Sequence, residues 1–353
     1  MAISARGVVT VDLAAVVANW RLLHDRHAPG AVAGVVKADG YGLGAGPVAR
    51  ALYAAGCGHF FVAQLGEGMA LRAAIGPGPM IAVLNGFAPG ADEDAGLMPV
   101  LNTLGDVARH RGRPAILHLD TGMARLGLDA REQARLAEDA ELRNSLNLRF
   151  VMTHLACADE PAHPLNALQA ARFAETAALF PGIPRSLANS SGLFLGQGFA
   201  SDLARPGCAL YGINPQPGGP NPMRPVMRLD VPVLQVREIG TGDTVGYGAS
   251  WGAPRPSRIA TVAAGYADGY LRSLSGRASA AIGDRPVPLV GRVSMDLITL
   301  DVTEFPDVVQ GTQVTLIGGP GCSPDELAAA CGTIGYEILT SLGPRYARAY
   351  LPA

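Results

Sequence analysis

Residues 31–44 read AVAGVVKADGYGLG, an apolar run that ends at a lysine and continues into a glycine-rich turn. An apolar run bounded by turn-forming residues is typical of a buried strand. The pattern recurs as far as residue 204, and helix-like segments separate most of the runs. The predicted strands are AVAGVV (31–36), HFFVA (59–63), MIAVL (80–84), MPVL (98–101), AILHL (115–119), LRFVMTHL (148–155), SLAN (186–189) and DLA (202–204). Strands alternating with helices in this way predict an α/β fold with an N-terminal (β/α)8 TIM-like barrel.

Helical periodicity is clearest in three segments between the predicted strands: GEGMALRAAI (66–75), REQARLAEDAEL (131–142) and LNALQAARFAETAALF (165–180). At the N-terminus, a strand at about 3–11 precedes a helix that Asp12 can cap, because the apolar residues after Asp12 recur at helical spacing. This first strand is able to pair with the C-terminal domain rather than with the barrel.

The composition changes at NPQPGGPNPMRP (214–225), which is typical of a linker. We therefore predict a barrel domain at 1–222 and a β-rich C-terminal domain at 223–353. The strands of the second domain are predicted within 231–239, 258–267, 277–302 and 312–318, with one helix at about 324–331. Gly283 and Asp284 form a predicted hairpin turn.

Composition excludes several classes of protein. The chain has 353 residues and is 48% hydrophobic, which allows a large core. A formal net charge of −2 gives no reason to expect nucleic acid or an anionic membrane as a partner. The five cysteines are scattered and form no C-x-x-C pair, so neither a disulfide framework nor a metal site is predicted. Without a recognisable signal peptide or an apolar run of membrane-spanning length, we expect a cytoplasmic protein.

Lys37 is the sole lysine of the chain, and the other counted basic residues are arginines. Both side chains solubilise a surface, but only the lysine amine can lose its proton and form a Schiff base with a carbonyl. The alternative is a chance lysine at a strand end, with its stem on apolar surface. In a chain that uses arginine everywhere else, the chemical interpretation is favoured.

Polar candidates follow several of the predicted barrel strands. Lys37 follows the first strand, Arg125 the fifth, Ser190 the seventh and Arg205 the eighth, and His154 lies at the end of the sixth. In barrels of this type the carboxyl ends of the strands meet on one face, where catalytic residues lie. The sequence therefore predicts one constellation on that face.

A Schiff-base lysine opposite Gly/Ser loops suggests pyridoxal 5'-phosphate, an aldehyde cofactor with a phosphate group. The loops 190–192 and 207–208 follow the seventh and eighth strands, where barrels commonly hold phosphate. Taken singly, each loop could be an ordinary turn. The alternating glycines at 40–46 match neither the dinucleotide-binding nor the P-loop spacing.

Motifs in both halves of the chain resemble the signature segments of the bacterial alanine racemase family and occur in that family's order. They are VVKADGYGLG, HLDTGMARLG, ANSSG, RPGCALYG, GYGASW, GYADGY, GRVSMD and GYEIL. The resemblance implies a pyridoxal-phosphate-dependent isomerase. It would interconvert L-alanine and D-alanine, for peptidoglycan or for D-alanine breakdown, as a homodimer with shared active sites.

The resemblance also implies roles for the catalytic residues. Lys37 would hold the cofactor through a Schiff base and act as one acid/base group. Tyr247 of the partner subunit's C-terminal domain would act from the opposite face. His154 would link Tyr247 to Arg205, and Arg205 would face the pyridine nitrogen of the cofactor, where an always-charged donor leaves that nitrogen unprotonated.

Further roles follow from the same resemblance. The residues that correspond to phosphate contacts are Tyr41, Ser190, Gly207, Cys208 and Tyr336. The residues that correspond to the substrate side are Arg125, with Met295 and Asp296 from the partner, and Tyr266, which with Tyr336 would line a narrow access passage.

Two positions depart from the family pattern. Many members carry a carbamylated lysine that neutralises the arginine corresponding to Arg125; here that position is His118. A water, an anion or His118 itself could orient Arg125, and His118 within an apolar strand is otherwise expected to be a core residue. Ser294 stands where the family often has cysteine, and its backbone N–H can still serve.

Three alternatives remain open at the level of sequence. One is a racemase of another small amino acid, such as serine. A second is a related decarboxylase, although the cysteine- and aspartate-bearing site expected for it is not recognisable. A third is a non-catalytic protein that binds pyridoxal phosphate. Single-barrel proteins of that kind lack a β domain, so Tyr247 and GRVSMD would have no place in them.

Overall fold

The computed structural model of the chain describes residues 7–88, 90 and 96–353. The described chain divides into two compact units. One consists of the described part of Met1–Ala15 with Tyr41–Leu43 and Pro225–Ala353, and the other of Val16–Gly40 with Gly44–Arg224. Residues 3–6 of the predicted first strand lie outside the described residues.

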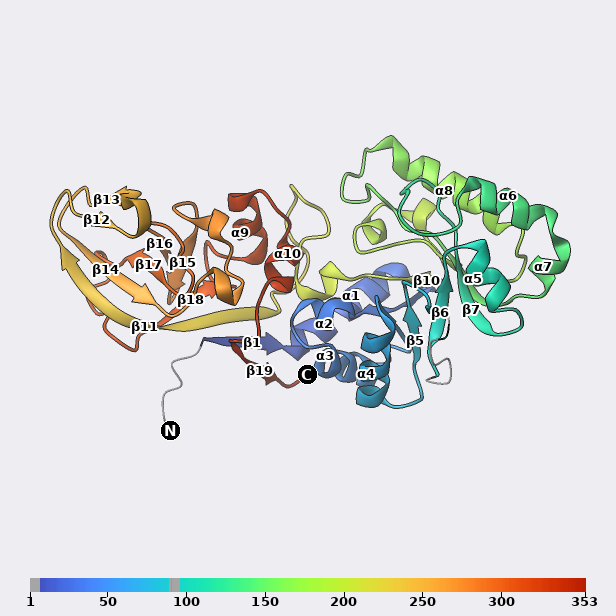
Figure 1. The fold of residues 1–353 in the computed structure, drawn as a ribbon, viewed down its shortest axis with the longest axis horizontal. Helices are drawn as coiled ribbons and strands as arrows, with labels where there is room; N and C mark the ends of the chain where they lie inside the picture. The colour runs from blue at the N-terminus through green and yellow to red at the C-terminus, as the bar shows by residue number, and fades with distance from the viewer. Residues whose placement is uncertain (1–6, 89, 91–95) are drawn as a thin grey trace. The chain divides into compact units, whose positions relative to one another are not determined.

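The second of these units is a barrel of parallel strands (Figure 1). Its main sheet has the order β3 (Gly34–Val35), β4 (His59–Val62), β5 (Met80–Val83), β6 (Met98–Leu101), β7 (Pro114–His118), β8 (Asn147–Met152) and β9 (Arg185–Ser186). The last strand, β10 (Leu203–Ala204), pairs with β2 (Ala31–Val32), which shares its apolar run with β3. Arg205 N–H donates to Ala188 O at 2.8 Å and holds the chain after β10 beside the chain after β9. Each of the eight predicted strands overlaps an observed strand, but the strand predicted at 148–155 ends at Met152 and the one predicted at 186–189 shares only Ser186 with β9.

Helices separate most of the barrel strands and cover their outer side. They are α3 (Ala45–Ala54), α4 (Leu65–Ile75), α5 (Leu104–Arg109), α6 (Ala130–Glu138), α7 (Ala140–Asn144) and α8 (Pro164–Ala177). Phe60, Phe61 and Val62 are consecutive in β4, and all three are fully buried. A parallel strand covered on both faces reads as a continuous apolar run, which is why the runs identified the strands.

The single helix predicted at 131–142 is wrong, because the structure has two helices there. The backbone of Asp139 leaves the helical region, with φ −91° and ψ 85°. The Asp139 carboxylate instead accepts from Leu142 N–H at 2.8 Å and caps α7. Aspartate favours a cap over a helix interior because its side chain competes for backbone N–H groups.

The N-terminal elements are β1 (Val8–Asp12) and α1 (Leu13–His27). β1 pairs antiparallel with β11 (Met227–Ile239) and parallel with β19 (Ala347–Leu351), so this strand joins the sheet of the C-terminal segment. The predicted cap of α1 is confirmed, since Asp12 Oδ1 accepts from Ala15 N–H at 2.9 Å.

The other unit is mainly β. Besides β1, β11 and β19, its sheets contain β12 (Thr244–Val245), β13 (Trp251–Gly252), β14 (Ser257–Val262), β15 (Ser279–Ile282), β16 (Arg285–Pro288), β17 (Ile298–Asp301) and β18 (Gln313–Ile317). The predicted hairpin turn is confirmed, because Ile282 pairs with Arg285 across Gly283, whose φ is +62°.

One late helix was expected in the mainly β unit, and the structure has two. The predicted helix is α9 (Pro324–Cys331), and α10 (Gly335–Thr340) follows it. The strand predicted at 258–267 ends earlier, at Val262, and Tyr266 begins a 3-10 turn, η5 (Tyr266–Asp268). Among the residues that the structure describes, no helix is long and apolar enough to cross a membrane.

Candidate active site

Lys37 lies directly after the first barrel strand and is partly buried. Burial is the largest effect on its amine and lowers its pKa, since desolvation disfavours the charged form. The nearby Arg125 guanidinium lowers the pKa further, while Glu67 and Cys208 oppose the shift. The sole lysine is therefore held where its amine loses a proton more readily than on an open surface.

The turn that follows Lys37 is left-handed. Ala38, Asp39, Gly40 and Tyr41 have φ values of 53°, 51°, 62° and 55°. For a residue other than glycine this conformation costs about 1–2 kcal/mol. Hydrogen bonds within the segment help to hold the turn: among them, Gly40 N–H donates to Val36 O at 2.9 Å, and Ala45 N–H donates to Asp39 Oδ1 at 2.9 Å. Strained backbone of this kind persists only where the surroundings enforce it.

Arg205 is 4% exposed and is held by barrel residues. Its guanidinium donates to the Ser186 hydroxyl, to Thr153 O and to His154 Nδ1, the last at 3.4 Å. Burial lowers the pKa of Arg205 to about 10, so the side chain is still charged at neutral pH. A buried cation with several fixed acceptors is an oriented donor rather than a mobile one.

The contact with Arg205 decides the tautomer of His154. A guanidinium only donates, so His154 Nδ1 must accept, and the ring proton is on Nε2. Burial and the charge of Arg205 move the pKa of His154 well below its ordinary value, so the ring is neutral. His154 Nε2–H is thus a neutral hydrogen-bond donor at the strand-end face of the barrel.

Gln169 of α8 is fully buried and was not among the sequence predictions. Its amide nitrogen donates to His154 O at 2.9 Å and to Thr121 Oγ1 at 3.2 Å, and its oxygen accepts from Ala156 N–H at 2.9 Å. One side chain therefore ties the loop after β7 to the loop after β8. No local signal in the sequence distinguishes this glutamine from the surface residues of the same helix.

Ser190 and Gly207 come together after β9 and β10. The Ser190 hydroxyl accepts from Gly207 N–H at 3.0 Å and from Ala209 N–H at 3.3 Å. Cys208 lies between these two donors and begins the 3-10 turn η3 (Cys208–Tyr211). Converging backbone N–H groups and a hydroxyl suit a phosphate, and the Lys37 amine suits an aldehyde. The residues present in the barrel therefore fit pyridoxal phosphate.

Arg125 is exposed in the loop after β7. The loop is organised by Asp120, whose carboxylate accepts from Gly122, Met123 and Ala124 N–H groups, each at 2.9 Å. Those bonds shape the turn and explain why an aspartate follows this strand.

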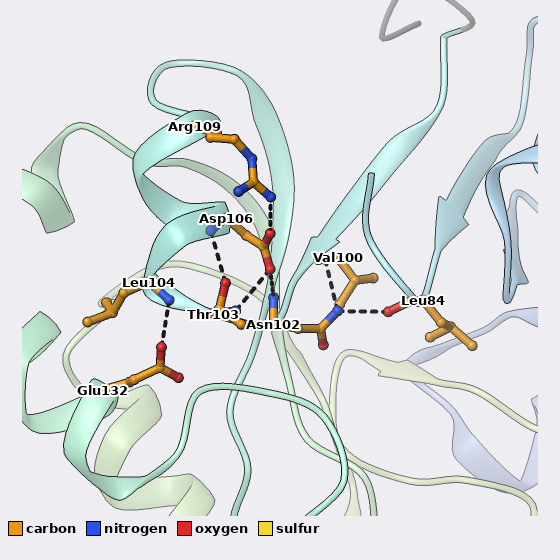
Figure 2. Close-up of polar contacts among 8 residues, drawn as sticks. All are labelled: Leu84, Val100, Asn102, Thr103, Leu104, Asp106, Arg109 and Glu132. Atoms are coloured by element: carbon orange, nitrogen blue, oxygen red, sulfur yellow. Dashed lines mark hydrogen bonds and ion pairs between the residues drawn. The ribbon is translucent and has the colours of Figure 1, made fainter. Parts of the chain in front are cut away.

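His118 is a buried and neutral residue. Asn102 uses its amide nitrogen to donate to Leu84 O and Val100 O, as Figure 2 shows, so its oxygen must accept from His118 Nδ1, at 2.9 Å. Burial, followed by the charge of Arg205, lowers the pKa of His118 to about 3. The expectation of a core histidine is confirmed, and His118 brings no charge of either sign toward Arg125.

The mainly β unit brings Tyr41 and Tyr336 together. Their rings meet edge to face, with centroids 6.4 Å apart and an interplanar angle of 77°. Gly42 allows this approach, because its φ is +80° and a Cβ there would lie 2.6 Å from Leu339 O. Two of the residues predicted to contact phosphate are thus neighbours.

Three further candidates lie on two loops bonded to each other. Tyr266 N–H donates to Ser294 O at 3.0 Å, next to Met295 and Asp296. The Asp296 carboxylate accepts from Arg345 at 2.8 Å. Tyr266, Met295 and Asp296 are all exposed. The Ser294 N–H, which we expected to be available, donates to Leu297 O at 3.0 Å.

Tyr247 is 71% exposed and begins the 3-10 turn η4 (Tyr247–Ala249). It stands between Gly246 and Gly248, whose φ values are +73° and +71°. The Arg292 guanidinium packs against Gly248, where a Cβ would lie 3.1 Å from it. Glycines therefore shape a sharp turn that leaves the tyrosine ring projecting outward.

A parallel barrel with a polar strand-end cluster, followed by a mainly β unit, defines a class of α/β enzymes that work at the carboxyl ends of barrel strands. Residues 11–215 match the alanine racemase N-terminal domain and residues 226–350 match the alanine racemase C-terminal domain. The chain belongs to the alanine racemase family.

Alanine racemases from other organisms are similar to this protein over almost its whole chain. An alanine racemase from Acidiphilium cryptum is 56% identical, covering 96% of this chain and 97% of its own. One from Rhodospirillum rubrum is 50% identical, and the alignment covers 98% of this chain and 96% of that protein. The crystal structure of a Bartonella henselae alanine racemase with covalently bound pyridoxal phosphate has a TM-score of 0.93 and 40% identity, covering 99% and 100%. The chain is thus an isomerase of a pyridoxal-phosphate-dependent family.

Proposed function

We propose that this protein interconverts L-alanine and D-alanine with two acid/base groups, Lys37 and Tyr247 of the partner subunit. The observation that carries the proposal is the partly buried amine of the only lysine, held at the strand-end face of a racemase-family barrel. Racemisation needs one group that removes the α-proton and another that returns a proton from the opposite side. A single flexible base on one face would return the proton where it left.

The cofactor, when bound, supplies an electron sink that makes the α-proton of the amino acid acidic. The residues proposed to hold it are Lys37, Tyr41, His154, Ser190, Arg205, Gly207, Cys208 and Tyr336. Ser190 Oγ and the N–H groups of Gly207 and Ala209 already converge, which supports a phosphate position there. Arg205, pinned by barrel acceptors, would donate to the cofactor's ring without giving up a proton.

The second base needs help, because the ordinary pKa of tyrosine is about 10. His154 carries its proton on Nε2 and is neutral, so it can donate to a tyrosine oxygen. That hydrogen bond favours the phenolate over the phenol, and Arg205 behind the ring strengthens the donor. We propose this chain of donors as the activation of Tyr247.

The remaining candidates are assigned to the substrate. Arg125 would bind the alanine carboxylate, and Met295 and Asp296 of the partner subunit would lie on the carboxylate side of the substrate. Tyr266 and Tyr336 would narrow the access passage, which favours small amino acids over larger ones. The region 223–353 would deliver these groups and Tyr247 to the partner.

The biological setting follows from the reaction. We propose a cytoplasmic homodimer that supplies D-alanine for peptidoglycan or breaks it down. Alanine is preferred to serine in this proposal because the similar curated proteins are named alanine racemases.

The test uses the two proposed bases. Purified protein is reduced with borohydride and digested, and a pyridoxyl-phosphate mass is expected on the Lys37 peptide. Tyr247→Phe should retain that mass and lose more than about 100-fold in racemisation of at least one enantiomer. Tyr53→Phe, which alters an exposed tyrosine of α3 with no proposed role, is the matched control and should leave racemisation unchanged. Normal turnover by Tyr247→Phe would remove it from the mechanism.

A further inference from the structure

Glu67 is partly buried in α4 and divides its carboxylate between two strand ends. One oxygen accepts from Ala63 N–H at 2.8 Å and from Gln64 N–H at 3.1 Å, which caps the helix after β4. The other accepts from Ala38 N–H at 2.6 Å, in the turn that follows Lys37. The same side chain therefore joins the end of the first barrel strand to the end of the second.

Capping alone does not require a glutamate at this position. Asp106 occupies the equivalent third position of α5, and one of its oxygens accepts from Asn102 and Thr103 N–H groups, each at 3.0 Å (Figure 2). The aspartate makes the same two bonds that Glu67 makes to its own helix start. The longer side chain of Glu67 is what brings its second oxygen to Ala38.

Ala38 is where the chain most needs such a contact. It is the first residue of the left-handed turn, with φ +53° and no glycine to relieve the strain. It is also the immediate neighbour of Lys37, so a rotation of the 37–38 peptide redirects the lysine stem. A short bond from a carboxylate to Ala38 N–H opposes that rotation.

We propose that Glu67 is a positioning residue for Lys37: its second carboxylate oxygen holds the left-handed turn and so aims the lysine amine. The inference rests on the proposed function, because it assigns a purpose to the aim of that amine. Glu67 also adds negative charge near Lys37, and this charge raises the pKa of the amine, which burial and Arg125 lower. The other groups that face the amine are Cys208 and His154.

The test shortens the side chain. Glu67→Asp keeps the helix cap, as Asp106 does, and loses the reach to Ala38. Glu132→Asp is the matched control, because Glu132 holds the third position of α6 and accepts from Leu104 N–H at 2.9 Å in the neighbouring segment (Figure 2). Both variants should lose a similar few degrees of Tm. Only Glu67→Asp should lower kcat, by about tenfold or more, with KM for L-alanine within about twofold.

A second readout uses the full-length chain after the cofactor has been removed with hydroxylamine, because a Schiff base would otherwise block the amine. Since the chain has one lysine, the pH dependence of acetylation by acetic anhydride can be followed on the Lys37 peptide of the full-length chain by mass spectrometry. Glu67→Gln removes the charge, so the midpoint of this profile should move to lower pH, and Glu132→Gln should leave it in place.

The outcomes are distinct. If Glu67→Asp matches Glu132→Asp in kcat, and Glu67→Gln leaves the acetylation profile unchanged, Glu67 is only a helix cap and the proposal is overturned. If the unaltered protein neither racemises alanine nor carries a cofactor on Lys37, the proposed function fails instead. The acetylation profiles would then still decide whether Glu67 acts on Lys37.

Discussion

Single residues in the barrel are set to one protonation state by their hydrogen-bond partners. Arg205 forces His154 Nδ1 to accept, and Asn102 forces His118 Nδ1 to donate. Both histidines are neutral because burial and the nearby positive charge of Arg205 both lower their pKa values. Each of the two histidine rings thus has one fixed pattern of hydrogen-bond donor and acceptor and carries no charge.

Neutral His118 predicts a pH-dependent loss of stability. Its pKa is about 3 in the folded protein, so between about pH 6.5 and 3 the unfolded chain binds a proton that the folded chain does not. Stability therefore falls as the pH falls through this window, by up to about 1.4 kcal/mol per pH unit from this residue.

The measurement is the free energy of unfolding in urea between pH 7 and pH 4. His118→Asn should flatten the decline, because the asparagine has no proton to gain. An equally steep decline in His118→Asn would show that other groups account for it.

At the scale of elements, the loops at the carboxyl ends of the strands are fastened by side chains from the following helices. Glu67 reaches from α4 to two loops, and Gln169 reaches from α8 to the loops after β7 and β8. Strand ends are short and irregular, so their geometry depends on these long-range bonds rather than on ladder pairing. The geometry of the strand-end face therefore depends on residues of the surrounding helices.

Gln169→Ala tests this dependence. Removing the amide leaves His154 O and Ala156 N–H without that partner, which should cost about 2–3 kcal/mol of stability. Because His154 is displaced, kcat should fall about tenfold or more. Asn166→Ala removes another buried amide of α8, bonded to Glu160 O, and should lower stability while kcat is retained. Urea unfolding and steady-state kinetics measure both; equal kcat in the two variants would contradict a role for Gln169 at the site.

At the scale of the whole molecule, exposed side chains of the mainly β unit need an explanation. Tyr247 and Met295 are 71% and 53% exposed, and Tyr247 stands on a turn shaped by glycines. Large apolar side chains held outward on ordered turns are typical of surfaces that meet another chain. This is the arrangement that a shared active site in a homodimer requires.

Mixing two inactive variants tests the shared site. If each site takes Lys37 from one subunit and Tyr247 from the other, Lys37→Ala and Tyr247→Phe should each inactivate both sites of their own homodimer. A mixed dimer has one site with both residues intact, so random reassembly should restore about one quarter of full activity. Light scattering should show a dimer throughout. If no activity returns after the subunits are exchanged, or if a monomer is fully active, the active site is not shared between subunits.

Much of the fold was determined by the sequence itself. Strands buried on both faces are continuous apolar runs, so the strands at 31–36 and 59–63 could be predicted from the sequence. Lys37 could be singled out because its amine can form a Schiff base, which a guanidinium cannot. The break at Asp139 and the helix α10 were missed, since a short helix and a helix break differ from their neighbours by little local free energy.

Only the tertiary structure decided how the candidates are held. The sequence does not show that Glu67 reaches Ala38, because that contact joins residues 29 positions apart. The neutral state of His118 and the tautomer of His154 likewise depend on partners from other strands. Residue type states which chemistry is possible; burial and long-range hydrogen bonds set the protonation and direction with which it is used.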